Sequence, residues 1–119
     1  MRYIFDNDLH IHSGLSLCSG RPDQNPERIL QYAKDYGLKT VCLTDHYWDE
    51  AVPGGETGFY KPQNTEHIKK ALPLPKADGI EFLFGCETDM DKNGVIGISK
   101  ERMEEVDFYC NSYNSSAYA

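Results

Sequence analysis

Four segments of the chain have the hydrophobic pattern of β-strands. Residues 40–44 (Thr-Val-Cys-Leu-Thr) form a short and continuous apolar run, which is typical of a strand buried on both faces. Residues 3–11 and 80–87 also have the length and apolar content of strands, and residues 106–108 begin a fourth. Because helical segments separate these strands, we expect them to pair in parallel.

Helix start and stop signals lie between the expected strands. Asn25 is a good N-cap, Pro26 suits the first helical position, and Gly37 suits the position just after a helix. A second helix is expected over residues 64–72, because two prolines follow it, and a third begins at Ser99. Strands that alternate with helices in this way predict an α/β fold of about four βα units.

The number of βα units predicts an incomplete barrel. A closed eight-stranded βα barrel typically needs about 250 residues, whereas this chain has 119. We therefore interpret the chain as a partial barrel with parallel strands. Such a barrel has open sheet edges and an uncovered apolar face, so we expect the chain to form a homo-oligomer through these edges.

Charge and composition indicate which classes of partner and which cellular compartment suit the chain. The chain has 12 basic and 19 acidic residues, and its net charge of −7 argues against nucleic acid as a partner. Its four cysteines form no Cys-x-x-Cys pair, which favours a reducing, cytoplasmic environment. The chain is polar by Asp6 and has no apolar run near the ~20 residues of a membrane span, so we expect no signal peptide and no membrane partner.

Side chains that bind metals are found at the end of the first expected strand. His10 and His12 are two residues apart, so in a strand both imidazoles face the same side. Asp8 has the same parity, and we expect its carboxylate to support the two histidines as a hydrogen-bond partner. A His-x-His pair can also be incidental on a surface, so this segment alone does not establish a site.

The second and third expected strands end in further candidates. His46 ends the second strand, with Asp45 beside it as a supporting carboxylate, and Glu87 ends the third. Each residue also fits an ordinary role, since Asp45 could cap a helix and Glu87 could be solvated. Because the carboxyl ends of parallel strands meet at the edge where α/β barrels build their sites, the three segments together predict a metal site.

These segments resemble the first three motifs of the PHP (polymerase and histidinol phosphatase) domain family. The motifs are Asp-Leu-His-Ile-His-Ser at residues 8–13, Thr-Asp-His at residues 44–46 and Gly-Cys-Glu-Thr-Asp at residues 85–89. The resemblance extends over about residues 6–108, and order and spacing agree as well as content. It implies a distorted (β/α)7 barrel, of which this chain is the N-terminal portion. It also implies up to three divalent metal ions (zinc, manganese or iron) and the hydrolysis of phosphoesters.

The resemblance assigns roles to individual residues. His10, His12 and Glu87 match the ligands of a metal pair, with Glu87 as the bridging carboxylate, and His46 matches a ligand of the third metal. Cys18 stands where many members have another histidine. As a thiolate ligand it would favour zinc or iron over magnesium, and the alternative is a small buried loop thiol.

Three other features have both a functional and an ordinary interpretation. Arg21 could help to clamp a phosphate group, or it could be a surface residue. The aromatic residues of the loop at 47–60, which we expect to be exposed, could form a substrate wall or a flap over the barrel mouth. His67 lies in a polar helical turn, where we expect it to be solvated.

Residues 109–119 do not fit the family pattern and read as an atypical polar tail after the domain portion at 1–108. The family's later ligands, further histidines and an Asp-x-His motif, are not found in this segment. A shift of the reading frame by one nucleotide would permit a buried strand followed by two histidines. We therefore expect the tail to come from a frameshift or to be a disordered end; the alternative is a short natural module.

The sequence supports three hypotheses of function. The first is a PHP-type metal-dependent hydrolase that acts on a phosphorylated small molecule, with activity in doubt because the later ligands are missing. The second is a metal-binding or assembly module without turnover, which would hold fewer than three ions. The third is an amidohydrolase-like metal hydrolase, since those enzymes also begin with a His-x-His motif.

Overall fold

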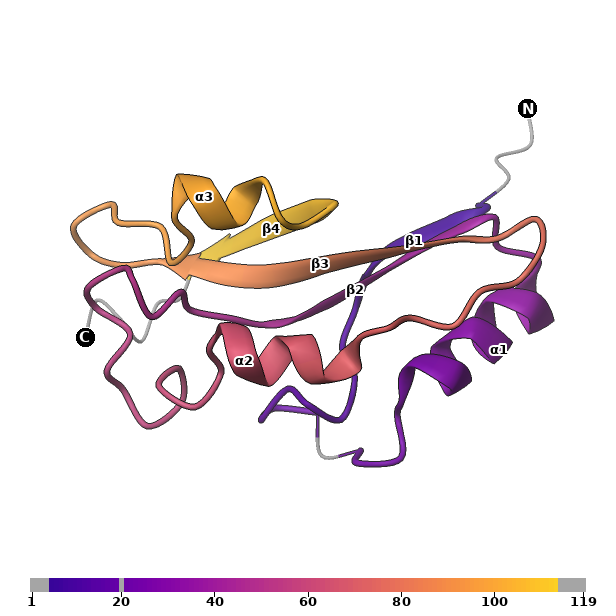
Figure 1. Ribbon diagram of the computed structural model, residues 1–119, viewed down its shortest axis with the longest axis horizontal. Helices are drawn as coiled ribbons and strands as arrows, with labels where there is room; N and C mark the ends of the chain where they lie inside the picture. The colour runs from indigo at the N-terminus through magenta and orange to yellow at the C-terminus, as the bar shows by residue number, and fades with distance from the viewer. Residues whose placement is uncertain (1–4, 20, 114–119) are drawn as a thin grey trace.

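The computed structural model describes residues 5–19 and 21–113, which form a four-stranded parallel sheet with helices packed against it (Figure 1). The strands are hydrogen-bonded in the order β1-β2-β3-β4. Their bounds are Asn7–Ile11 for β1, Thr40–His46 for β2, Glu81–Met90 for β3 and Phe108–Tyr113 for β4. The predicted α/β partial barrel with parallel strands is confirmed.

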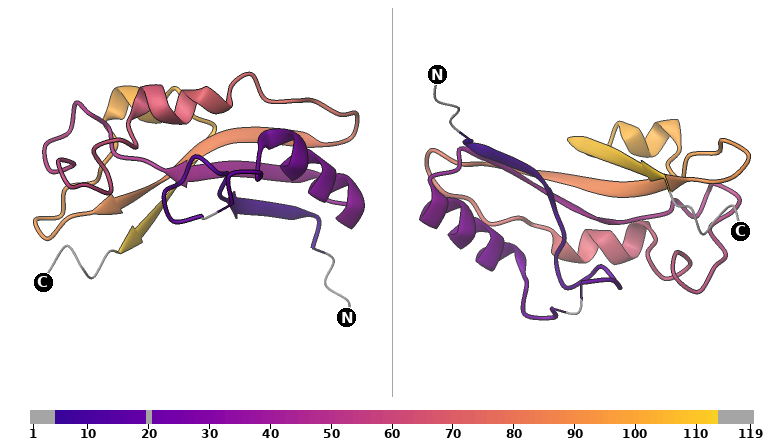
Figure 2. Two further views of the ribbon diagram at one scale, coloured as in Figure 1. Left: turned by 90° about the horizontal axis from the view of Figure 1, so that it is seen from below. Right: turned by 180° about the vertical axis from the view of Figure 1, so that it is seen from behind.

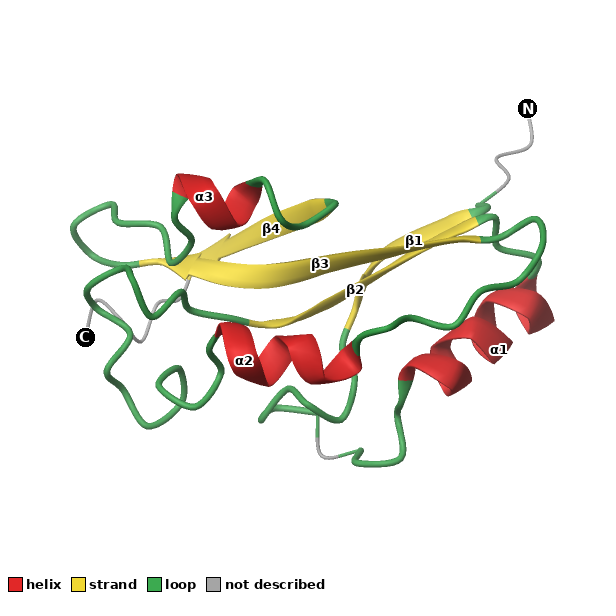
Figure 3. Cartoon of the chain, viewed as in Figure 1, coloured by secondary structure: helices red, strands yellow, loops and turns green. Residues whose placement is uncertain are grey.

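The helices occupy the segments between the strands (Figure 3). They are α1 at Pro26–Tyr36, α2 at Thr65–Ile68, the 3-10 turn η1 at Lys69–Ala71 and α3 at Lys100–Met103. The predicted caps of α1 are present: the Asn25 side chain accepts a hydrogen bond from the backbone N of Arg28, and Gly37 follows the helix with φ 68°. Glycine tolerates this left-handed conformation without steric cost.

Two hydrophobic clusters hold the helices to the sheet. Ile29 and Ala33 of α1 pack with Val41 and Leu43 of β2. The second cluster joins α2 to β3 and to the segment before α3, through Tyr47, Ile68, Phe84, Cys86 and Ile98. Because side chains alternate along a strand, residues of the other parity in β2 and β3 face the opposite side of the sheet. His46 and Glu87 have that parity, and they are paired in the parallel register.

The turn after β3 and the extent of β4 complete the sheet. An Asn-Gly pair at 93–94 suits a type I′ turn, which needs a positive φ at both central residues. Among the described residues every positive φ belongs to a glycine, here Gly94 at 80°, so the turn is of another type. The Asp91 carboxylate instead accepts hydrogen bonds from the backbone N of Asn93 and of Val95, so that side chain organises the turn. The strand β4 crosses the predicted boundary at residue 108, and the last part of the expected tail, residues 114–119, lies outside the described residues.

Within the described part of the chain, no helix has the length and apolar character needed to cross a bilayer. All four cysteines are free thiols.

Candidate metal centre

Three histidines and one carboxylate converge at the carboxyl ends of β1, β2 and β3. The Nε2 atoms of His10 and His12 both contact Oε1 of Glu87, with 2.8 Å for His12. On the other side of the same carboxylate, Oε2 lies 3.7 Å from Nδ1 of His46. Glu87 therefore lies between the imidazoles, which is the arrangement a bridging carboxylate requires. Its side chain is 7% exposed, so it is not a solvated carboxylate.

A register irregularity in β1 decides which residues accompany the histidines. The pairing of β1 with β2 shifts between Asp8 and Ile11, as in a β-bulge, so strict alternation fails in this segment. Asp8 consequently bonds away from the histidine rings: its carboxylate accepts from the backbone N of His10 and from the hydroxyl of Tyr32 on α1. Asp8 therefore contacts His10 through the backbone and not through the ring, because the alternation of side chains is interrupted between the two residues.

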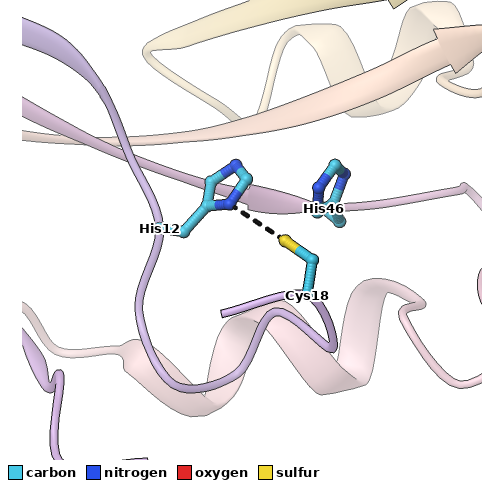
Figure 4. Close-up of side chains that lie close together, drawn as sticks. All are labelled: His12, Cys18 and His46. Atoms are coloured by element: carbon cyan, nitrogen blue, oxygen red, sulfur yellow. Dashed lines mark hydrogen bonds between the residues drawn. The ribbon is translucent and has the colours of Figure 1, made fainter. Parts of the chain in front are cut away.

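Cys18 lies beside His12 and His46 (Figure 4). Its Sγ is 3.4 Å from Nδ1 of His12, and the donor atoms of the three residues are within 4.8 Å of one another. The residue is exposed, which contradicts the buried-thiol alternative. Partial burial of the sulfur and the negative charges of Glu87 and Asp45 raise the pKa of Cys18. A bound cation reverses this effect, since it stabilises the thiolate.

His46 provides the physical test of whether these residues fit a metal ion. Burial lowers the pKa of His46, which favours the neutral imidazole that metal binding requires. Its Nδ1 is buried and has no hydrogen-bond partner among the described residues. An unpaired buried nitrogen is uncommon in folded proteins, and a cation bound between it and Glu87 would give this nitrogen a partner. The donor set of imidazole, carboxylate and thiol therefore fits a divalent ion.

Asp45 supports the centre by holding the loop that follows β1. Its buried carboxylate accepts hydrogen bonds from the backbone N of Ser13 at 2.6 Å, from Oγ of Ser13 at 2.7 Å and from Oγ of Ser16 at 2.8 Å. Oγ of Ser16 in turn accepts from the backbone N of His46. Asp45 thereby fixes the loop that carries Cys18 relative to the end of β2.

Two residues that the sequence did not single out as supports hold the same loop. Oε1 of Gln63 accepts from the backbone N of Leu17, and Nε2 of His67 lies 2.7 Å from the carbonyl of Leu15. His67 is half-buried, so the expectation that it is solvated was wrong; the helix α2 presents it to the loop. The sequence carries no signal for these contacts, because they join segments about 50 residues apart.

The aromatic residues of the 47–60 loop are mostly buried, contrary to expectation. Tyr47, Trp48 and Tyr60 are 1%, 5% and 6% exposed. The rings of Phe59 and Tyr60 meet the His46 ring edge-on, with centroids 5.1 and 6.4 Å away. These two rings form an apolar wall beside His46.

The side chain of Arg21 bonds within its own loop. It is exposed, and its Nε bonds to the carboxylate of Asp23 in the loop before α1. Its surface interpretation is thus the one that the geometry favours.

A second group of donor atoms includes a residue that the sequence interpretation missed. His10, Glu87 and Cys110 bring their donor atoms within 4.8 Å of one another. Cys110 is on β4, directly opposite Glu87 in the parallel register. The sequence did contain a signal, because in a strand that continues from Phe108 the alternation of side chains gives Cys110 a defined face of the sheet. This signal was missed because residues from 109 onward were assigned to the polar tail.

The comparison with protein families shows to which family the chain belongs. The model of the PHP domain matches residues 8–118. The chain belongs to the PHP family. The match includes the three motifs and continues past residue 108 through most of the segment that was predicted to be a tail. It favours the PHP interpretation over the amidohydrolase-like one.

Two curated relatives support the same assignment. A "Probable phosphatase" of Caldicellulosiruptor saccharolyticus is 28% identical to this PHP chain over 103 residues, and one of Caldicellulosiruptor bescii is 29% identical over 103 residues. Each alignment covers 85% of this chain and 38% of the relative. The chain thus spans well under half the length of these relatives.

Proposed function

We propose that this chain contributes the metal centre of a PHP-type hydrolase that acts on a phosphorylated small molecule. The observation that carries the proposal is the convergence of His10, His12 and His46 on the two oxygens of Glu87. Convergent imidazole and carboxylate groups at the carboxyl ends of parallel strands are the usual basis of a hydrolytic metal site in α/β barrels. The names of the two relatives agree with a phosphatase activity.

Each residue of the centre has a distinct part in the proposed reaction. Glu87 has oxygens directed to both sides, so it can hold two cations at a fixed separation, and His46 offers a neutral nitrogen. Cations bound there would activate water and offset the charge of a phosphoryl group. Phe59 and Tyr60 exclude water from one side of His46 and would shape the substrate pocket. The thiol of Cys18 favours zinc or iron over harder ions.

A metal-binding module without turnover is the second candidate. It rests on the same convergent groups, which can bind a metal ion whether or not a substrate is hydrolysed. The two candidates share the metal centre and differ only in catalysis.

Metal analysis and a phosphatase assay separate these candidates. We expect the purified protein to contain zinc, iron or manganese, and to hydrolyse a generic aryl phosphate in the presence of added zinc or manganese. Bound metal without hydrolysis selects the module.

Substitution of both His10 and His12 by alanine tests the site itself. We expect the double variant to lose its bound metal, because it loses two of the imidazoles around Glu87. The matched control is His67→Ala, which removes an imidazole outside the centre. Unchanged metal content in the double variant would overturn the proposed site.

We also propose that the chain associates with a second copy of itself. The two outer strands, β1 and β4, each have one neighbour within the described sheet, so their other edges can accept another strand. A wide groove of about 1040 Å³ runs beside β3. Its lining includes the apolar residues Leu74, Ile80, Phe82 and Phe84 and the charged residues Lys34, Lys76, Asp78 and Asp107. Light scattering at micromolar concentration should show a dimer or larger species; a strict monomer contradicts this proposal. We also propose a cytoplasmic location. The free thiols agree with it, because disulfides are rare in that reducing compartment.

A further inference from the structure

We propose that Cys110 is a metal ligand, and that the centre holds two cations in adjacent sites, each with one thiolate. One site comprises His12, Cys18 and His46, and the other comprises His10, Cys110 and Oε1 of Glu87. Oε2 of Glu87, which lies 3.7 Å from Nδ1 of His46, is directed to the first site, so Glu87 can bridge the two. This inference rests on the proposed function, since it assumes that the centre binds metal. It goes further in assigning a ligand to the fourth strand and in dividing the ligands between two ions.

The strand register places Cys110 at the centre. Glu87 of β3 and Cys110 of β4 are partners in the parallel ladder, so their side chains leave the same face of the sheet. In the parallel ladder of β2 and β3, His46 is likewise the partner of Glu87. The three residues therefore form one row across three neighbouring strands. The side chain of His10, from β1, reaches this row through its contact with Oε1 of Glu87.

The curvature of the sheet brings the ends of this row together. Neighbouring strands are about 4.8 Å apart, so in a flat sheet β1 and β4 would be separated by about 14 Å. The donor atoms of His10 on β1 and Cys110 on β4 are nevertheless within 4.8 Å of each other. The twist of the strands, which is visible in Figure 2, accompanies this closure. Bringing together three donors from β1, β3 and β4 is thus a property of the fold and not of neighbouring sequence.

The contacts of the Cys110 sulfur leave it available to an ion. Cys110 is half-buried, and its Sγ lies 3.8 Å from the carbonyl of Cys86 and also contacts the side chain of Thr44. Hydrogen bonds to a thiol are weak, so a cation can replace them. Ligands of one zinc ion lie about 2.0–2.3 Å from it, so two of them are at most about 4.6 Å apart. The separations in both donor groups are of this order. Each group would combine one thiolate with nitrogen or carboxylate donors, which suits zinc, iron or cobalt.

Cobalt(II) titration of the metal-free protein tests the inference, because a thiolate bound to cobalt gives a near-ultraviolet charge-transfer band. We expect the wild-type chain to bind two equivalents of cobalt, with a band produced by two thiolates. The variants Cys110→Ser and Cys18→Ser should each lose about half of that band. Cys110→Ser should also retain only one tightly bound equivalent, and the double variant should show no band.

The control is Cys42→Ala, which removes a buried thiol that belongs to neither donor group. It should keep the full band and both equivalents. Far-ultraviolet circular dichroism identifies any variant that fails to fold, and for such a variant Cys110→Ala replaces Cys110→Ser. If folded Cys110 variants retain the wild-type band and stoichiometry, Cys110 is not a ligand. If the wild-type chain binds no cobalt at all, the proposed metal centre fails as well, so the two failures are distinguishable.

Discussion

Individual residues at this centre work through hydrogen bonds that the chain's local pattern does not reveal. Asp45 was expected to support His46 because it is adjacent in sequence. In the structure it acts mainly on Ser13 and Ser16, about 30 residues earlier, and through Ser16 on the backbone of His46. Asp8 was expected in a similar role, and its carboxylate accepts from the backbone N of His10 and from the hydroxyl of Tyr32 on α1. Both residues are aspartates, but Asp45 holds the loop that follows β1, whereas Asp8 bonds to helix α1.

Substitution of Asp45 by alanine should loosen the loop that carries Cys18. The change leaves buried donors of Ser13 and Ser16 unpaired, so we expect a loss of about 2–4 kcal/mol in the free energy of unfolding. Cobalt affinity should fall roughly 10- to 100-fold, as for other residues that orient metal ligands. Chemical denaturation and cobalt titration measure the two effects. The exposed Asp35→Ala variant should change stability by less than about 0.5 kcal/mol, and equal effects in both variants would contradict this role of Asp45.

At the scale of elements, the pairing of β3 with β4 depends on one glycine. A Cβ atom on Gly85 would lie 2.2 Å from the carbonyl oxygen of Phe108 and 2.9 Å from Sγ of Cys42. The first contact is with backbone, which cannot yield without moving β4. Gly85 thereby lets the two strands approach closely, and this approach sets the position of Cys110 opposite Glu87.

The variant Gly85→Ala should force β4 away from β3. We expect it to lower the free energy of unfolding by about 1–3 kcal/mol, the usual cost of inserting a methyl group into packed structure. Urea denaturation measures this loss. Gly58→Ala is the matched control, because a Cβ at Gly58 meets no atom within 4 Å. A Gly85→Ala chain as stable as the control would show that the close approach of the two strands is not required.

At the scale of the whole molecule, the proposed metal centre joins the strands that the open sheet leaves furthest apart. Its donor residues come from β1, β2, β3, β4 and the loop after β1. A cation bound there acts as a cross-link between the two edge strands of an incomplete barrel. Metal binding and folding should therefore be coupled, as they are in other proteins whose ligands meet only in the native state.

Zinc should raise the thermal stability of the chain, and removal of zinc by a chelator should reverse the effect. A ligand that binds only the native state at 100 times its dissociation constant adds about 2.7 kcal/mol. Thermal unfolding followed by circular dichroism, with and without zinc, measures the shift. The His10→Ala, His12→Ala double variant should show little shift, and a full shift in that variant would place the stabilising zinc elsewhere.

The sequence by itself determined the parallel α/β fold, the caps of α1 and the approximate positions of the strands, because these depend on local periodicity and capping groups. It also predicted that His10, His12, His46 and Glu87 would lie close together, since strand ends in this fold share one edge and the motifs resemble those of the PHP family. Only the tertiary structure decided which side chains accompany them. The irregular register of β1 turned Asp8 toward α1, and the curvature of the sheet brought Cys110 to His10 and Glu87. Bulges and curvature arise from packing across the whole sheet, so no short stretch of sequence specifies them.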